Sequence, residues 1–160
     1  MPKFLSDNFT WVETTASNTA QAHNIDNTEG MTTAVEFACM NTATGMERVR
    51  AILGNKSIHI NSWYRSSALN LIVGSKPTSQ HRKGEAVDFT CAAFGTPLEV
   101  CKLLVANREL IKFDQLILEH SWIHISFVIP DVVPRNQVLS LLESGGYATG
   151  LTTQKGIAYV

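Results

Sequence analysis

Two histidines and one aspartate occur at spacings that suit a single metal ion. His81 and Asp88 belong to the segment S-Q-H-R-K-G-E-A-V-D-F, and His124 belongs to the segment E-H-S-W-I-H-I-S further along the chain. Two imidazoles and a carboxylate are ligands that zinc prefers, and three protein ligands leave a fourth position for water, as in catalytic zinc sites. Zinc would lower the pKa of that water towards neutrality, so that a nearby carboxylate could take its proton. The spacing alone leaves a second interpretation open, in which His124 is a hydrogen-bonded core residue and His81 an exposed loop residue.

The remaining histidines and the cysteines suit this role less well. We expect His59 to be an ordinary strand residue and His23 a loop residue. A thiolate ligand at Cys91 would complete the coordination shell and close the zinc site to water. The cysteines are odd in number and lack C-x-x-C spacing, which favours buried reduced thiols over a disulfide framework. The residues concerned are Cys39, Cys91 and Cys101.

Alternating apolar and polar residues predict the strands that must position these ligands. One strand is expected over residues 57–64, and a second over residues 85–90, directly after the loop that contains His81. Residues 113–119 and 122–128 predict two further strands with a very tight connection at His120-Ser121. Strands joined by so short a turn must run antiparallel, so we expect a mainly antiparallel sheet.

Helix signals surround these strands. The sequence predicts helices over residues 31–53, 66–73, 96–107 and 134–142. Thr96-Pro97 is typical of a helix start, Gly45 marks a possible break in the first helix, and Gly145-Gly146 would end the last one. Residues 1–30 carry few helix or strand signals. This mixture predicts an α+β fold, formed by one compact domain over residues 1–160.

Composition excludes several classes of function. The chain has 160 residues, of which 44% are hydrophobic and 17% charged, and a formal net charge of −1. A near-neutral chain has no broad basic field, so we expect no nucleic-acid partner. Its apolar runs are far too short for a membrane span, and the N-terminus has no apolar stretch of signal-peptide length. We therefore expect a monomer that is made in the cytoplasm without a signal peptide.

Several motifs, in order along the chain, resemble one family of peptidases. The pattern S-x-H-x-x-G-x-A-x-D at residues 79–88, followed by W-x-H at residues 122–124, resembles the zinc D-alanyl-D-alanine peptidases. Upstream, residues 4–10 resemble the opening of the small phage-type branch, and residues 60–70 resemble its S-G-Y-R-S-x-x-L-N segment. The similarity covers about residues 4–146. The family includes DD-carboxypeptidases, dipeptidases and phage L-alanyl-D-glutamate endopeptidases, with an α+β fold that Hedgehog signalling domains share.

The resemblance implies roles for individual residues. It assigns the zinc ligands to His81, Asp88 and His124. Arg65 matches the family arginine that stabilises the substrate carbonyl or its oxyanion, a task that suits a guanidinium because it does not titrate. Ser79 matches a serine that contacts substrate, although a serine in such a loop can equally form the turn by bonding its own backbone.

The general base is assigned less directly. The best-known members carry a carboxylate three residues before the last zinc histidine, where this chain has Ser121. The phage-type branch has its glutamate further upstream, and Glu119 fits that arrangement. Strand alternation puts residues 120, 122 and 124 on one face, so we expect the tight turn to swing Glu119 inward. In the alternative, Glu119 is an exposed strand-end residue and His120 is the polar group at the metal. Trp122 is expected to form a wall of the site.

The resemblance thus predicts a zinc peptidase that cleaves a peptide bond in peptidoglycan stem peptides. The branch it resembles implies a phage or prophage enzyme, either an endolysin or part of a virion, which acts on the cell wall after release. Two alternatives remain open from the sequence. One is a DD-carboxypeptidase, and the other is a non-catalytic cell-wall-binding or virion structural domain held together by zinc. Catalysis needs Arg65 and a carboxylate base, whereas zinc-stabilised binding needs only the three ligands.

Overall fold

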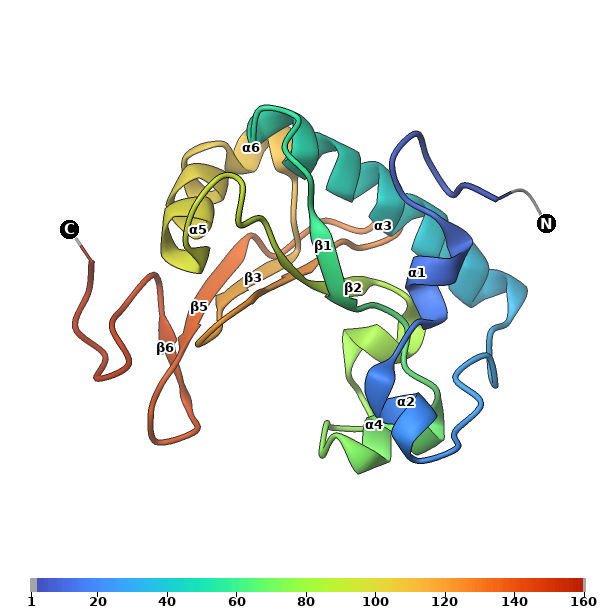
Figure 1. Ribbon diagram of the computed structural model, residues 1–160. Helices are drawn as coiled ribbons and strands as arrows, with labels where there is room; N and C mark the ends of the chain where they lie inside the picture. The colour runs from blue at the N-terminus through green and yellow to red at the C-terminus, as the bar shows by residue number, and fades with distance from the viewer. Residues whose placement is uncertain (1–2, 160) are drawn as a thin grey trace.

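The computed structural model describes residues 3–159 and contains one mixed sheet (Figure 1). The strand order is β1-β2-β4-β3-β5-β6, and the β3–β5 pair is parallel while the other four pairs are antiparallel. In chain order the strands are β1 (His59–Ser62), β2 (Ala86–Thr90), β3 (Gln115–Leu118), β4 (Ile123–Ser126), β5 (Gln137–Leu141) and β6 (Tyr147–Thr149). The predicted α+β class with a mainly antiparallel sheet is confirmed.

Helices lie on both sides of this sheet. The longest, α3, lies on one side together with α5 and α6, and α4 lies on the other side near β1 (Figure 1). The helices are α1 (Trp11–Thr15), α2 (Asn18–Ala22), α3 (Thr33–Ile52), α4 (Ser67–Ile72), the 3-10 helix η1 (Gln80–Lys83), α5 (Pro97–Ala106) and α6 (Arg108–Ile111). The helices predicted over residues 31–53, 66–73 and 96–107 are confirmed. Residues 1–30, which carry few helix signals, contain α1 and α2, and these helices begin at Thr10 and Ser17 caps.

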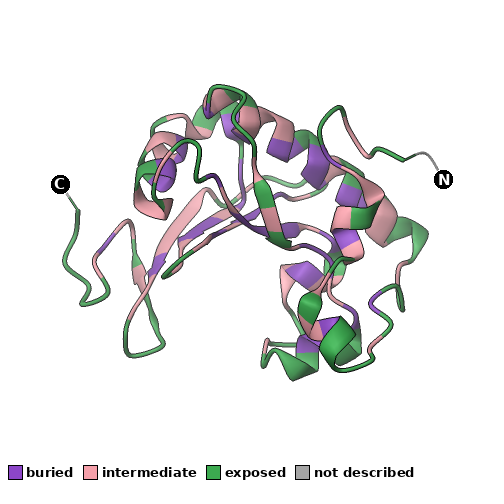
Figure 2. Cartoon of the chain, in the orientation of Figure 1, coloured by how far each residue is buried: buried purple, intermediate pink, exposed green. Residues whose placement is uncertain are grey.

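Alternation divides the central strands between two faces. Val87, Ile125 and Leu116 lie side by side on β2, β4 and β3, and all three belong to the hydrophobic core. The neighbouring residue on two of these strands, Asp88 after Val87 on β2 and His124 before Ile125 on β4, therefore points to the opposite face. Figure 2 shows the buried residues gathered on α3 and on the central strands. One face of the sheet thus forms the core with the helices, and the other is left free to form a site.

Glycine at position 45 serves close packing and does not break the helix. Helix α3 runs uninterrupted through Gly45. A Cβ atom at this position would lie 2.6 Å from ring atoms of Phe127, so no larger residue fits between the helix and that ring. The possible break expected at Gly45 is therefore wrong.

The helix predicted over residues 134–142 is also wrong. Residues Gln137–Leu141 form β5, which runs parallel to β3 with Leu116 opposite Val138. Asn136 has a φ of 50°, a left-handed conformation that a right-handed helix cannot contain. The pair Gly145-Gly146 turns the chain from β5 into β6, because Gly145 has a φ of 86° and Leu142 donates to the carbonyl of Gly146 at 2.8 Å. Pairing with β3, a long-range contact, decides the structure of this segment.

Two further expectations concern the cysteines and the membrane. All three cysteines are free and buried, as expected. Burial raises the pKa of the Cys39 and Cys101 thiols to about 12, so both stay protonated. Within residues 3–159, no helix combines the length and the apolar character needed to cross a membrane.

Candidate metal centre

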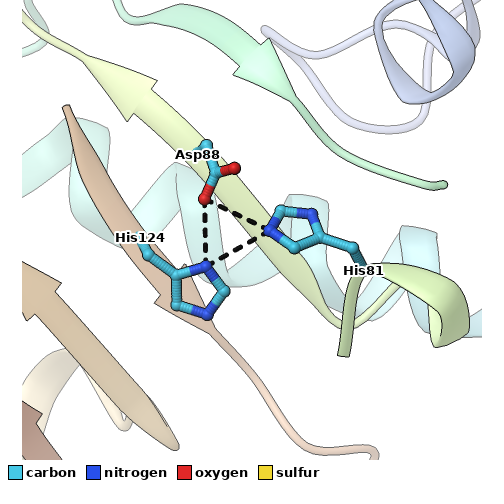
Figure 3. A group of neighbouring side chains, drawn as sticks. All are labelled: His81, Asp88 and His124. Carbon is cyan, nitrogen blue, oxygen red and sulfur yellow. Dashed lines mark hydrogen bonds and ion pairs between the residues drawn. The ribbon is translucent and has the colours of Figure 1, made fainter. Parts of the chain in front are cut away.

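Three side chains converge on the free face of the sheet: His81 from η1, Asp88 from β2 and His124 from β4 (Figure 3). Nε2 of His81 lies 3.2 Å from Oδ1 of Asp88 and 3.2 Å from Nδ1 of His124. Nδ1 of His124 lies 3.0 Å from the same Oδ1 atom. The three atoms form a small triangle, all within 4.8 Å of one another, and could hold one metal ion.

The protonation of His81 suits this triangle to binding a cation. Its other ring nitrogen, Nδ1, lies 2.6 Å from the carbonyl oxygen of Trp63 and must carry the proton, because a carbonyl only accepts. Burial lowers the pKa of His81, which favours the neutral ring. Nε2 of a neutral ring protonated at Nδ1 is a bare lone pair, and it faces the carboxylate of Asp88. A proton or a metal ion bound to Nε2 would join these two acceptors, and a metal-ligating histidine characteristically donates its other N–H in this way.

The neighbouring elements hold His81 in this orientation. Gly84 ends η1 with a φ of 75°, and a Cβ atom there would lie 2.7 Å from the Cys39 sulfur of α3. The carbonyl of Gly84 accepts hydrogen bonds from Thr42 of α3 and from the indole of Trp63. Glycine at this position lets the 3-10 helix turn and pack directly on α3, which places the imidazole over the sheet.

Sheet register brings the other two ligands together. Asp88 on β2 and His124 on β4 are directly opposite each other in an antiparallel pair, so their side chains share a face. Burial by itself would raise the pKa of Asp88, but the positive charge and N–H groups that His81 and His124 present when protonated outweigh it and hold that pKa well below its ordinary value. A metal ion in place of those protons would favour the ionised carboxylate in the same way. The site therefore offers an ionised carboxylate beside two imidazoles, which is the donor set that zinc prefers.

Arg65 contacts one of these ligands directly. Its Nη2 atom lies 2.5 Å from Oδ2 of Asp88, while Nε donates to Ser62 and Nη1 to Ser75. The guanidinium is 14% exposed and borders the same cleft as the ligands. Arg65 thus orients Asp88 and neutralises its charge, a contact that the sequence did not predict. Further N–H donors on Nη1 and Nη2 remain for a substrate.

A buried asparagine that the sequence analysis missed fixes the backbone around Arg65. The side chain of Asn27 donates to the Tyr64 carbonyl at 3.1 Å and accepts from the Ser66 amide at 2.9 Å. The amide of Arg65 itself donates to the His81 carbonyl at 3.1 Å. No local pattern marks Asn27, because its partners lie almost forty residues away in the chain.

Glu119 shares the face of the metal ligands without any rearrangement of the turn. Ile117 on β3 lies opposite His124 on β4, and Glu119 follows Ile117 by two positions. Two positions along a strand return to the same face, so the expectation that the turn must swing Glu119 inward is wrong. That expectation counted alternate residues from His124 on β4 back through the turn to Glu119. Alternation does not continue through a turn, and Glu119 follows the alternation of β3. Burial raises the pKa of Glu119, and the negative charge of Asp88 raises it further.

The three other predicted substrate residues occupy different positions. Trp122 borders the cleft beside the ligands. Ser79 also borders the cleft, but its hydroxyl accepts from the His81 amide at 3.3 Å and so caps η1. The exposed His120 lies 2.6 Å from the side-chain amide of Gln154 and does not border the cleft. The structure therefore gathers Trp122 and Ser79 with the ligands and turns His120 towards the C-terminal segment.

The cleft itself has a volume of about 1350 Å³ and crosses the free face of the sheet. At one end it is bordered by the loop between α4 and η1, and at the other by β5 and β6. His23, His59 and Cys91 are not among the residues that border it, and the Cys91 thiol donates to the Ser57 carbonyl at 3.3 Å. A peptide of several residues fits this volume, and His81, Asp88 and His124 all border it.

Comparison with known proteins gives one positive result. The family model described as Peptidase M15 matches residues 7–126, which include the η1 turn, β2, the β3–β4 hairpin and all three converging side chains. No curated protein matches the chain. Because the match covers most of the chain and contains the complete site, this protein belongs to the Peptidase M15 family.

Proposed function

We propose that this protein is a zinc-dependent peptidase that hydrolyses a peptide bond in the stem peptides of peptidoglycan. Family membership supports a peptidase. The observation that carries the zinc requirement is the bare lone pair on Nε2 of His81, held 3.2 Å from the carboxylate of Asp88 and from Nδ1 of His124. A metal ion bound between these atoms would satisfy all three of them at once.

The ligand set also suits catalysis. Zinc bound by His81, Asp88 and His124 would keep a position open for water, lower the pKa of that water and polarise a substrate carbonyl. The cleft leaves this position accessible, because the triangle borders open space and His124 is 12% exposed. A purely structural zinc site would instead be closed by a fourth protein ligand.

Glu119 is the residue we propose as general base. It borders the cleft on the same face as His124, and its carboxylate is close enough to Asp88 and His124 to interact electrostatically with both. In this role a carboxylate oxygen of Glu119 accepts a proton from the attacking water and delivers it to the leaving amine. His120 lies outside the cleft and has no part in this transfer.

The remaining predicted residues would bind and orient the peptide. We propose that Arg65 donates its free N–H groups to the carbonyl oxygen as negative charge develops there. Trp122 forms a wall of the site, and Ser79 has a hydroxyl at the cleft as well as its capping bond to His81. Both would set the direction in which the peptide lies.

Digestion of purified peptidoglycan followed by mass spectrometry of the fragments tests this function. The zinc-loaded protein should release fragments that a chelator-treated sample does not. Cleavage inside the stem peptide would identify an endopeptidase, and loss of a terminal alanine would identify a DD-carboxypeptidase. Peptidoglycan that stays uncleaved in the presence of the zinc-loaded protein would contradict the proposed activity and favour a non-catalytic wall-binding domain.

The biological setting is proposed from the resemblance alone. The small phage-type branch that residues 4–10 and 60–70 resemble suggests an endolysin or a virion-associated enzyme. A lysis assay with added protein on permeabilised bacteria, compared with the same protein after zinc removal, tests whether it attacks the wall from outside. No loss of turbidity in the zinc-loaded sample would contradict this setting.

A further inference from the structure

The cleft has a second wall that lies outside the family match. The match ends at residue 126, whereas one end of the cleft is bordered by residues 128–147. This wall consists of the segment between β4 and β5, followed by β5 and β6. Its lining residues are mostly apolar: Val128, Ile129, Val132, Val133, Leu139 and Tyr147. The family relationship therefore describes the metal and one side of the cleft, and this chain's own C-terminal part supplies the other side.

An ion pair between Arg135 and the buried carboxylate of Asp114 ties this wall to the turn that carries His81. Arg135 donates from Nη2 to Asp114 at 2.5 Å and from its backbone amide to the same carboxylate at 2.9 Å. Asp114 also accepts from Gln80 at 3.0 Å, and Gln80 directly precedes His81. The side chain of Asp114 is only 2% exposed, whereas that of Arg135 is 53% exposed. One carboxylate anchored in the core thus contacts both the wall and the residue that precedes His81.

Sheet register places one hydroxyl group of this wall beside the site. Ile117 on β3 pairs with Leu139 on β5, so the positions two residues further along, 119 and 141, share the cleft face. Leu141 in turn lies opposite Tyr147 on β6. Tyr147 therefore stands in the same row as Glu119, with only one strand between them. The phenol ring is long enough to extend over that strand.

The electrostatics agree with this placement. Burial raises the pKa of Tyr147, and the negative charges of Glu119 and Asp88 raise it further. The phenol accordingly stays protonated and is a hydrogen-bond donor at neutral pH. Tyr147 remains 54% exposed although it borders the cleft, so its O–H group is accessible to a ligand.

We propose that Tyr147 is a substrate-binding residue on the wall opposite Arg65, where its O–H group donates a hydrogen bond to a main-chain carbonyl oxygen of the bound peptide. Arg65 follows β1 at one edge of the sheet, and Tyr147 lies on β6 at the other edge. A peptide that crosses the metal triangle would contact both. This inference rests on the proposed peptidase function and adds the residue that holds the far end of the substrate.

Tyr147→Phe tests this role because it removes only the hydroxyl. The matched control is Tyr159→Phe, which removes the same group from a tyrosine that packs on Lys102 outside the cleft. We expect Tyr147→Phe to raise KM for a stem peptide by roughly five- to tenfold with little change in kcat, since one lost hydrogen bond to a bound substrate acts on binding. Circular dichroism and zinc content should equal those of the wild type, and Tyr159→Phe should behave as the wild type does.

A binding measurement separates this inference from the proposed activity. Calorimetry with the zinc-loaded Glu119→Gln protein and an intact stem peptide should give a Kd that rises by the same factor when Tyr147→Phe is added. Unchanged KM and Kd in Tyr147→Phe, beside an active wild type, would overturn the role of Tyr147 alone. A wild type that neither cleaves nor binds the peptide would overturn both proposals.

Discussion

Glu119 and Trp122 face each other across a two-residue turn, with the Glu119 amide donating to the Trp122 carbonyl at 3.2 Å. This hydrogen bond continues the register that puts Ile117 opposite His124. It therefore determines which side of the sheet Glu119 occupies. A one-residue shift in the pairing of β3 with β4 would turn Glu119 and His124 to opposite faces of the sheet.

Glu119→Gln should lose most turnover but keep the fold and the zinc. An amide is nearly the same size as a carboxylate and is not a ligand here, yet it cannot accept the proton of water. We expect kcat to fall on the order of 10²- to 10⁴-fold. Stem-peptide hydrolysis and zinc analysis of the same preparation measure both properties. His120→Ala is the matched control, and its loss of activity should be small. An active Glu119→Gln beside an inactive His120→Ala would show that His120, and not Glu119, is the base.

His124→Ala should abolish stable zinc binding. The wild-type protein is expected to hold about one equivalent of zinc after dialysis, because three protein ligands converge on one point. Removal of one imidazole leaves two ligands, which is too few for a stable site. Metal analysis by atomic emission compares the variant with His59→Ala, whose side chain lies away from the cleft. Full zinc occupancy in His124→Ala would refute the ligand assignment.

Arg65→Ala should reduce kcat/KM by about 10²-fold, as for the loss of a donor to the oxyanion. The bond from Arg65 to Oδ2 of Asp88 adds a second expectation, a zinc affinity lower by about tenfold, because this contact orients a ligand. Activity assays at saturating zinc separate the two effects. Arg108→Ala on α6 is the control. A variant with wild-type kcat/KM at saturating zinc would show that Arg65 only orients the ligand.

Asp114→Asn should make the free energy of unfolding depend less strongly on pH in the acidic range. Burial by itself would raise the pKa of Asp114, but hydrogen bonds from Arg135 and Gln80 outweigh it and lower that pKa. A lowered folded pKa means that Asp114 stabilises the fold above its unfolded pKa of about 4, and that this stabilisation is lost as the pH falls through the folded pKa.

Urea denaturation with chelator present, from pH 6 down to about pH 2, measures this loss. The free energy of unfolding should fall less steeply below about pH 4 in Asp114→Asn than in the wild type. At neutral pH the substitution should cost about 1–3 kcal/mol, since it weakens hydrogen bonds to a charged group. Asp131→Asn replaces an exposed carboxylate in the same connection and serves as the control. Identical pH profiles for wild type and Asp114→Asn would contradict the prediction.

Gly45→Ala should destabilise the fold by about 1–3 kcal/mol. The added Cβ atom would lie 2.6 Å from the Phe127 ring, which is buried between α3 and the sheet. Thermal or urea unfolding measures the change. Gly146→Ala is the control, because a Cβ atom there meets nothing closer than 4.0 Å. A stability equal to that of the wild type would mean that the ring can move aside without cost.

Local patterns in the sequence determined a large part of this protein. The alternation around Asp88 and His124 was sufficient to predict both strands, and the Thr96-Pro97 start was sufficient to predict α5. Residue types at fixed spacing were sufficient to propose a metal site, and ordered motifs indicated the family that the match over residues 7–126 confirms. These features depend on neighbours within a few residues, which is the range over which backbone preference and side-chain periodicity act.

Only the tertiary structure decided the features that depend on distant partners. Residues 137–141 form a strand because β3 offers them a parallel partner, although their local signals favoured a helix. Asn27 supports the site because it bonds the backbone on either side of Arg65. Tyr147 reaches the cleft because β3, β5 and β6 pair side by side. Long-range pairing supplies hydrogen bonds and burial that outweigh the small differences in local preference, so no window of sequence contains this information.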